Sequence, residues 1–379
     1  MRKEAFLSYI YGYLNLVRVM QMRIPEGMTW KDFKITEAGL HLGLSRRLAK
    51  GLLKPFAFLS PLEIAVSCPI VFFRFLSCLV RKPFLADKPL DAGTLMVEEG
   101  FPQEDLIAKT DIDKKDIISM VIPFTCRNDH QGMRHANVLS KLSYKEICVS
   151  FVWSLRLMGY MNRKYGRRDL FMRYYSSFEF FLAYLFAHHV GNDYDFLFIS
   201  TYSRWAYLNG SLPNRKTFIQ HGFLSGKWDL VRKIGIVDEA YYISEDQRLI
   251  CERMLFRNSP AYKYETKLVF TYFPPADKTC VLIVGNSSYN EPEENVITKL
   301  SGKPSLLLLV KPHPNTKNAA FYQDMVSRHG ILLLGREDFP KVDYVISYNS
   351  TLATQYENVG IPVYRYADEH FEDEISSIQ

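Results

Sequence analysis

The residues best placed for chemistry follow an apolar run near the C-terminal end of the 379-residue chain. Residues 305–314 read SLLLLVKPHP, so the run leads directly into Lys311, Pro312, His313 and Pro314. Lysine supplies a positive charge and histidine a titratable imidazole. A proline on each side of His313 restricts the backbone that carries the ring. Such a loop is suited to hold an anion, above all a phosphate group.

A buried strand must position this loop. An uninterrupted apolar run of this length is typical of the central strand of a parallel sheet, because helices cover both faces of such a strand. In open α/β sheets, ligands bind outside the carboxyl ends of the strands. The sequence therefore predicts a ligand site at the loop that contains Lys311 and His313.

A second strand end follows within residues 339–364, which predict a short strand from Tyr344 to Ser347, a polar turn, a helix and another strand. Asn349, Ser350 and Thr351 fall where the helix begins, and side chains of these types are good N-caps. The free N–H groups and the positive dipole end of a first helical turn favour an anion. This turn and the loop at 311–314 are therefore predicted to bind one phosphate-bearing ligand.

Another predicted strand, within residues 215–223, ends at Gln220, His221 and Gly222. Its tip combines an imidazole with a glycine, which permits close approach of the backbone to a ligand. We interpret His221 either as a functional group in the crevice or as a turn residue whose ring is bonded to a carbonyl oxygen.

The motif GNSS at residues 285–288 follows a predicted strand that opens the last third of the chain. Gly285, Asn286 and Ser287 are suited to offer N–H groups and a hydroxyl to a diphosphate. The motif has a single glycine and is not G-x-G-x-x-G, so a site for NAD or FAD is disfavoured.

The strand ending in KPHP and the later DYVISYNST, residues 343–351, together resemble the C-terminal half of GT-B glycosyltransferases that build bacterial surface polysaccharides. Sialyltransferase-like and Kdo-transferase-like enzymes are most similar, with CDP-glycerol-transferase-like enzymes as cousins, and the resemblance covers residues 195–365. It implies that the HP motif at His313 and the Ser/Thr motif at Ser350 and Thr351 hold the donor's nucleotide phosphate. It further implies that the HG motif at His221 faces them across a cleft.

The same resemblance implies a function. A sugar would pass from a nucleotide-activated donor, with a CMP-sugar such as sialic acid or Kdo favoured, to a growing capsule, lipopolysaccharide or other surface glycan. We expect inverting transfer without a metal ion, because no DxD-like motif is predicted at a strand end. Lys311 and His313 would stabilise the leaving phosphate, and His221 is the first choice for the base. Two other classes stay open: a nucleotide-sugar epimerase of the same architecture, and a non-catalytic scaffold of a polysaccharide assembly complex.

An acidic motif, Glu98-Glu99-Gly100, follows the apolar residues 94–97. In the sialyltransferase-like families an acidic pair before a glycine supplies the general base, so Glu98 and Glu99 are the second choice for that role. The acidic motif lies farther from the KPHP motif in the sequence than is expected for those families. The alternative interpretation is a solvated acidic turn.

The predicted fold class is α/β, GT-B-like, with two Rossmann-like domains facing each other across a cleft and additional helices near the N-terminus. We predict an N-terminal acceptor-side domain at residues 1–255, a linker at 256–276 and a C-terminal donor-binding domain at 277–379. Residues 126–137 are predicted to be a polar loop, and residues 143–190 to be mostly helical with aromatic packing faces.

Residues 41–82 hold seven cations and one acid. Their net charge of +6 equals that of the whole chain. Large apolar blocks separate these charges, but no block approaches the roughly 20 residues that span a bilayer. The segment suits an anionic membrane surface, here the cytoplasmic face of the inner membrane, or a core helix with solvated charges. Nucleic acid is disfavoured as a partner because no recognition motif accompanies the basic residues.

The six cysteines show no metal-ligand spacing and are predicted to be buried thiols of a reducing compartment. The N-terminus lacks the uninterrupted apolar core of a signal peptide. We therefore expect a cytoplasmic protein that needs no cofactor or metal ion and takes a nucleotide-sugar donor and a glycan or lipid-linked glycan acceptor.

Overall fold

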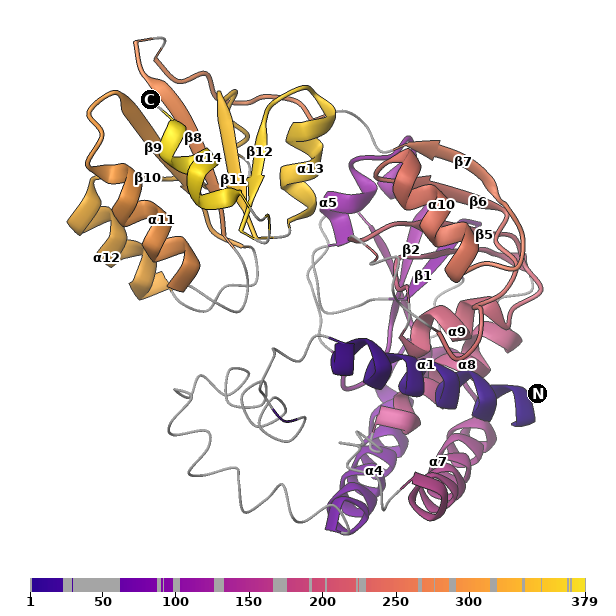
Figure 1. The fold of residues 1–379 in the computed structure, drawn as a ribbon. Helices are drawn as coiled ribbons and strands as arrows, with labels where there is room; N and C mark the ends of the chain where they lie inside the picture. Colours follow the sequence, from indigo (N-terminus) through magenta and orange to yellow (C-terminus); the bar gives the residue numbers. More distant parts are fainter. Residues whose placement is uncertain are drawn as a thin grey trace. The chain divides into compact units, whose positions relative to one another are not determined.

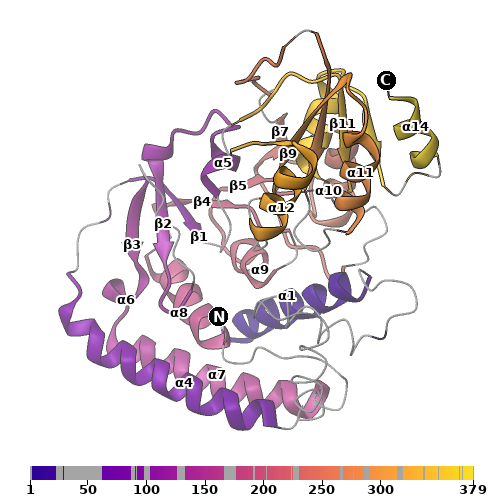
Figure 2. The same cartoon turned by 90° about the vertical axis from the view of Figure 1, so that its left-hand side faces the viewer.

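The structure is a computed structural model of the 379-residue chain. It describes residues 2–22, 29, 62–86, 90, 92–97, 103–125, 133–165, 176–190, 193–201, 203–222, 224, 230–264, 268–275, 277–285, 291–313, 319–335, 338–348, 350–366, 368 and 370–378. These residues form two compact units, Met1–Glu265 and Thr266–Gln379. Each unit is a parallel sheet covered by helices (Figures 1 and 2).

The first unit is built on a seven-stranded sheet in the order β3-β2-β1-β4-β5-β6-β7. All neighbouring strands are parallel. The strands are β1 (Thr94–Val97), β2 (Ile117–Val121), β3 (Arg134–Asn137), β4 (Asp195–Phe198), β5 (Lys216–Ile219), β6 (Glu239–Tyr242) and β7 (Ala261–Tyr264). The order 3-2-1-4-5-6 is that of a Rossmann fold, with its topological switch point between β1 and β4.

The helices of the first unit cover both faces of this sheet. They are α1 (Arg2–Met22), α4 (Leu62–Arg81), α5 (Gln103–Ile107), α6 (Val138–Lys141), α7 (Tyr144–Tyr165), α8 (Ser176–His189), α9 (Arg204–Gly210) and α10 (Glu245–Met254), with short 3₁₀ turns η2 (Lys82–Phe84) and η3 (Lys114–Asp116). Strand side chains alternate between the faces. Phe196 and Phe198 of β4 pack toward α8, α9 and α10, whereas Leu197 packs toward α5.

A helical layer extends the first unit beyond its sheet. Helix α8 is buried along nearly its whole length, and α1, α4 and α7 pack around it. The rings of Phe75 on α4 and Phe151 on α7 stack with centroids 4.4 Å apart, and the two helices lie side by side in Figures 1 and 2. These helices confirm the additional helices and the aromatic packing faces predicted from the sequence.

The second unit repeats the design on a smaller scale. Its sheet has the order β10-β9-β8-β11-β12, all parallel. The strands are β8 (Thr279–Val284), β9 (Leu306–Lys311), β10 (Leu332–Leu333), β11 (Tyr344–Ser347) and β12 (Val363–Arg365), and the helices are α11 (Glu291–Ser301), α12 (Ala319–His329), α13 (Thr351–Asn358) and α14 (Phe371–Ser377). Helices α11, α12 and α14 cover one face and α13 the other. The α/β class with two Rossmann-like units is confirmed.

Four details differ from the sequence-based predictions. The apolar run of β9 is interior, but β8 is the middle strand of its sheet. Residues 134–137, predicted as part of a polar loop, form the edge strand β3, and residues 261–264, predicted as linker, form the edge strand β7. Both are polar or exposed because an edge strand needs no continuous apolar run. Among the described cysteines, Cys148 is exposed rather than buried.

Candidate anion-binding site of the second unit

Three neighbouring strands of the second sheet end at the same level. Val284 of β8 is in register with Lys311 of β9 on one side and with Ser347 of β11 on the other. Read in chain order, this sheet also follows the 3-2-1-4-5 order, so its switch point lies between β8 and β11. Gly285, His313 and Ser350, the described residues of the turns predicted to bind phosphate, follow these strands and therefore lie along one sheet edge.

Gly285 brings the turn after β8 against the turn after β9. Its N–H donates to the carbonyl oxygen of Lys311 at 2.9 Å. A Cβ atom at this position would lie 2.6 Å from the Tyr322 hydroxyl oxygen and 3.2 Å from the backbone nitrogen of His313. A side chain here would displace the Tyr322 hydroxyl, and the glycine therefore permits the close packing of these strand ends.

His313 is partly buried in the turn that follows β9. Burial lowers the pKa of its imidazole below the usual range, because removal from water disfavours the charged form. The ring is therefore neutral at pH 7 in the unliganded protein. A bound phosphate dianion would favour the imidazolium, so ligand binding and protonation are expected to be coupled.

Ser350, one of the three N-cap candidates predicted from the sequence, is the N-cap of α13. Its Oγ accepts a hydrogen bond from the N–H of Leu352 at 3.2 Å, and its own N–H donates to Ser347 Oγ at 3.1 Å. Ser347 is buried at the end of β11. The polar turn is thus fixed by side-chain bonds at both ends, and Thr351 begins the helix. This arrangement places the positive end of the α13 dipole at the switch point.

Lys311 is only 8% exposed, and its ammonium group bonds within its own unit. Nζ donates to the carbonyl oxygens of Gly335 at 2.7 Å and Asp338 at 2.8 Å, and it lies 4.4 Å from the centroid of the Phe339 ring. The side chain therefore anchors the segment that follows β10 to the end of β9. Its predicted contact with a phosphate stays a prediction.

The sequence did not single out a buried polar pair beside this edge. Glu293 on α11 is fully buried and accepts a hydrogen bond from the Tyr322 hydroxyl at 2.8 Å. The hydroxyl of Tyr366 is buried without a hydrogen-bond partner among the described residues. In the sequence, Glu293 belongs to EPEEN, which reads as the solvated acidic first turn of a helix. Only the packing of α11 on α12 shows that this carboxyl group is inside.

Some predicted site residues lie outside the described part of the chain. These are Glu98, Glu99, Asn286, Ser287 and Asn349. Strand β1 ends at Val97, directly before the acidic pair, and β1 borders the switch point of the first sheet.

His221 follows β5 in the first unit and is exposed. The turn that carries it is held by its buried neighbour Gln220, which donates to Gln247 Oε1 at 2.7 Å and to the carbonyl oxygen of Gly222 at 2.9 Å. The N–H of Ile243, at the end of β6, donates to Gln220 Oε1 at 3.2 Å. The imidazole thus stands on a rigid turn at the carboxyl edge of its own sheet.

Comparison with known proteins gives structural similarity only. No family model and no curated protein sequence matches the chain. Among solved structures, sucrose-phosphate synthase from Thermosynechococcus elongatus is similar with a TM-score of 0.38, at 11% identity over 75% of this chain and 83% of the other. The wall teichoic acid polymerase TagF matches with a TM-score of 0.37, at 11% identity over 80% of this chain and 79% of the other. MurG of Acinetobacter baumannii matches with a TM-score of 0.36, at 10% identity over 76% of this chain and 82% of the other. The fold class itself rests on the strand orders described above.

Proposed function

We propose that the protein is a GT-B-type glycosyltransferase that uses a nucleotide-sugar donor. The observation that carries this proposal is the carboxyl edge of the second sheet, where Gly285 and the capped N-terminus of α13 border the switch point and His313 follows the neighbouring strand β9. A glycine-lined turn, an imidazole and a helix N-terminus are the groups that bind a diphosphate or phosphodiester in a Rossmann-like domain.

In the proposed reaction, a hydroxyl oxygen of the acceptor attacks the anomeric carbon of the donor sugar. The bond from that carbon to the phosphate oxygen breaks, and its electron pair leaves with the nucleotide. His313 and the α13 N-terminus, with Thr351 in its first turn, stabilise the negative charge that develops on the phosphate. His221 takes the acceptor proton, with Glu98 and Glu99 as the alternative base. The proposal is inverting transfer without a metal ion.

The proposed donor is a CMP-sugar such as sialic acid or Kdo, and the proposed acceptor is a capsule, lipopolysaccharide or other surface glycan. Support for this finer assignment comes from the KPHP and DYVISYNST motifs of the sequence. We place the reaction in the cytoplasm, at the inner face of the membrane where a lipid-linked acceptor would lie.

The proposed membrane contact is the exposed face of α4 and η2. None of the described helices is long and apolar enough to cross a bilayer. The helix buries Val71 and Cys78, while its opposite face exposes an apolar stripe. The apolar stripe consists of Phe72, Phe73, Leu76, Val80 and Phe84. Arg81 is exposed at its end, as are Lys145 and Arg156 on neighbouring α7. Apolar side chains bordered by cations fit an anionic lipid surface.

Donor turnover tests the proposed function. Purified protein is incubated with CMP-, CDP-, UDP- and GDP-sugars, and the nucleotide products are separated by chromatography. Release of free nucleotide from one donor, stimulated by a glycan acceptor, is the expected result. Interconversion of the sugar with the nucleotide still attached would indicate an epimerase. If no donor is turned over, whether or not it binds, the non-catalytic scaffold is the remaining interpretation.

A further inference from the structure

The first unit has a cavity at the amino edge of its sheet, opposite to the carboxyl edge that carries His221. Its volume is about 350 Å³, and its charged lining consists of Lys3, Glu4, Arg232, Lys233 and Arg257. It is bounded by the first turns of α1, the end of α9, and the segments that precede β6 and follow α10. A volume in this range accommodates a small organic ligand.

The charge of this cavity is strongly positive. Four cations line it against a single carboxylate, Glu4. The N-terminal end of α1, a helix of 21 residues, adds the positive end of its dipole. Lys233 is engaged with the last turn of α10, where Nζ donates to the carbonyl oxygen of Glu252 at 3.3 Å. Arg232 and Arg257 are therefore the cations that we consider for ligand binding.

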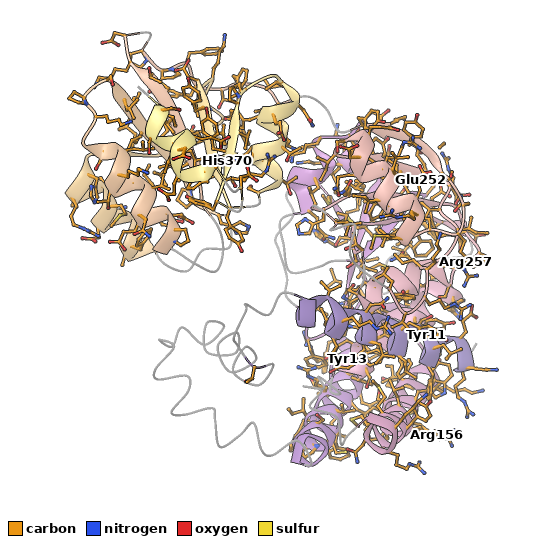
Figure 3. The ribbon with its side chains drawn as sticks, viewed as in Figure 1. Tyr11, Tyr13, Arg156, Glu252, Arg257 and His370 are labelled. Atoms are coloured by element: carbon orange, nitrogen blue, oxygen red, sulfur yellow. The ribbon has the colours of Figure 1, made fainter. Side chains whose placement is uncertain are left out.

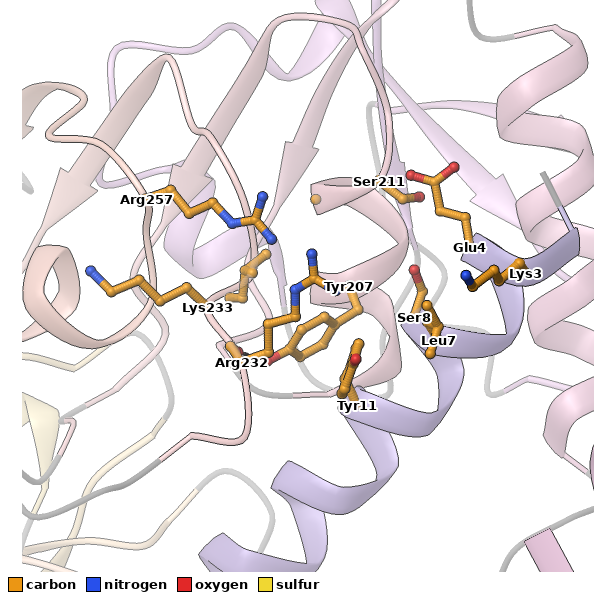
Figure 4. A pocket seen from close by; sticks show the side chains of 12 residues that line it. Lys3, Glu4, Leu7, Ser8, Tyr11, Tyr207, Ser211, Arg232, Lys233 and Arg257 are labelled. Atoms are coloured by element: carbon orange, nitrogen blue, oxygen red, sulfur yellow. Dashed lines mark hydrogen bonds between the residues drawn. The ribbon is translucent and has the colours of Figure 1, made fainter. Parts of the chain in front are cut away.

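Arg232 and Arg257 are both exposed and come from separate segments. In Figure 4 their guanidinium groups point toward one another across the cavity. Within the described part of the chain, neither group forms an ion pair, although the arginines at 215, 248, 328 and 365 all do. Two cations that line one cavity repel each other, and an anion bound between them would relieve that repulsion.

The backbone on which Arg232 stands is fixed by buried side chains. Asn15 of α1 is fully buried, and its Oδ1 accepts a hydrogen bond from the N–H of Val231 at 2.7 Å. Its Nδ2 donates to the Tyr207 hydroxyl, which in turn donates to the carbonyl oxygen of Arg232. The guanidinium also lies over the ring of Tyr11, 5.3 Å from the centroid. The position of Arg232 is therefore set before any ligand arrives.

The backbone of Arg257 is fixed in the same way. Its N–H donates to the carbonyl oxygen of Gly235 at 2.9 Å, and Ile234 donates to Leu255 at 2.7 Å. Gly235 in turn packs directly on Gly210 at the end of α9, where a Cβ on either residue would lie within 3 Å of backbone oxygen. Both arginines thus stand on a rigid frame, which lowers the entropy lost when a ligand binds.

Burial raises the pKa of Tyr207 to about 12, and the Asn15 hydrogen bond and the charges of Arg232 and Arg257 act in the opposite direction. Its hydroxyl therefore stays protonated at neutral pH and keeps donating to the Arg232 carbonyl.

We propose that this cavity binds a phosphate-bearing small molecule between Arg232 and Arg257. Planar guanidinium groups match the geometry of phosphate oxygens and bind them in bidentate fashion. Tyr11 offers an apolar ring to the remainder of the ligand. The site is separate from the proposed donor site, which belongs to the second unit, so the proposal does not depend on the glycosyltransferase function.

Isothermal titration of the 379-residue protein with inorganic pyrophosphate tests the proposal, with inorganic phosphate and CMP as further probes. We expect saturable binding of pyrophosphate that weakens as salt increases, because the contacts are ionic. Arg232→Gln and Arg257→Gln should each weaken it by roughly tenfold or more, the usual loss for a charge-assisted bond. Binding of CMP but not of pyrophosphate to the same arginines would identify a nucleoside monophosphate as the ligand.

Arg156→Gln is the matched control, since Arg156 is an exposed arginine on α7, well apart from Arg257 in Figure 3. His313→Ala is the second control, because it alters only the proposed donor site. Arg156→Gln should bind pyrophosphate like the wild type. His313→Ala should lose any pyrophosphate held at the proposed donor site and keep the binding that Arg232→Gln and Arg257→Gln weaken. All four variants should melt at the wild-type temperature. The proposal is overturned if the wild type binds none of the probes, if both cavity variants bind like Arg156→Gln, or if His313→Ala alone removes binding.

Discussion

His313 is the single residue on which the proposed donor site depends most. Burial lowers its pKa, so the free protein carries a neutral ring at pH 7. A phosphate that accepts a hydrogen bond from the ring would raise that pKa, and binding would then take up a proton. The affinity for phosphate therefore increases as the pH falls from the pKa of His313 in the complex toward its pKa in the free protein. At lower pH the affinity levels off.

The first prediction is that affinity for the nucleotide product increases on lowering the pH from 8 to 6, by at most about tenfold per pH unit. His313→Ala should lose this dependence, apart from the ligand's own titration, and kcat of transfer should fall by roughly 10² to 10³. Titration calorimetry at several pH values and initial rates are the measurements. A variant with the wild-type pH profile and rate, but a lower melting temperature, would make His313 a structural histidine.

At the scale of single elements, α4 shows how a charged residue is accommodated inside an apolar helix. Arg74 lies in the middle of the run and forms an ion pair with Glu179 of α8, whose side chain is only 3% exposed. Its guanidinium also lies 5.2 Å from the centroid of the Phe124 ring. Arg74 is therefore paired inside the unit rather than solvated; residues 41–61 of the basic segment lie outside the described residues.

The second prediction follows from this pair. Arg74→Ala leaves the Glu179 carboxylate buried without its counter-charge, which destabilises the fold by roughly 3–5 kcal/mol. Chemical denaturation of the two proteins measures the loss. The double variant Arg74→Met with Glu179→Leu should recover most of the stability, because similar apolar side chains replace both charges. Equal destabilisation in the single and double variants would mean that packing, not charge, dominates.

The apolar stripe on the opposite face of α4 gives the third prediction. Phe73 is 67% exposed. Phe73→Glu should weaken sedimentation with vesicles that contain phosphatidylglycerol, since it removes apolar area and adds a negative charge at the surface. The melting temperature should stay unchanged because the side chain packs on little. Leu249→Glu on α10, at a position 53% exposed, is the matched control and should bind like the wild type. Equal binding of all three proteins would exclude this face as the membrane contact.

The sequence predicted the elements whose cause is local, and it missed those whose cause is tertiary. Strands β9 and β11 were predicted because a strand covered on both faces needs an apolar run, and α13 because Ser350 is a good cap. The edge strands β3 and β7 carry no such signal. The cationic cavity joins residues from α1 to Arg257, more than two hundred positions apart. No local pattern contains that information.

At the scale of the whole molecule, the two units are each closed structures. In the second unit every strand except the short β10 contributes to a core that its own helices cover on both faces. Helix α14 completes one of these faces: Phe371, Ile375 and Ile378 are buried there. Lys299 forms an ion pair with Glu372 at 2.7 Å, and Lys303 donates to the carbonyl oxygen of Ser376 at 3.0 Å. The C-terminal segment is therefore part of this unit's core.

The last prediction is that residues 266–379, expressed alone, fold cooperatively, because the division between the units falls before Thr266 and the described helices of the second unit cover both faces of its sheet. Circular dichroism should show a single unfolding transition, and the fragment should bind the nucleotide in a manner that His313→Ala weakens. A fragment that ends at residue 370 is the control. It loses three buried apolar side chains that stabilise by roughly 1.5–3 kcal/mol each, a sum comparable to the whole stability of a small domain. If the longer fragment is as unfolded as the shorter one, the second unit depends on contacts from the first for its stability.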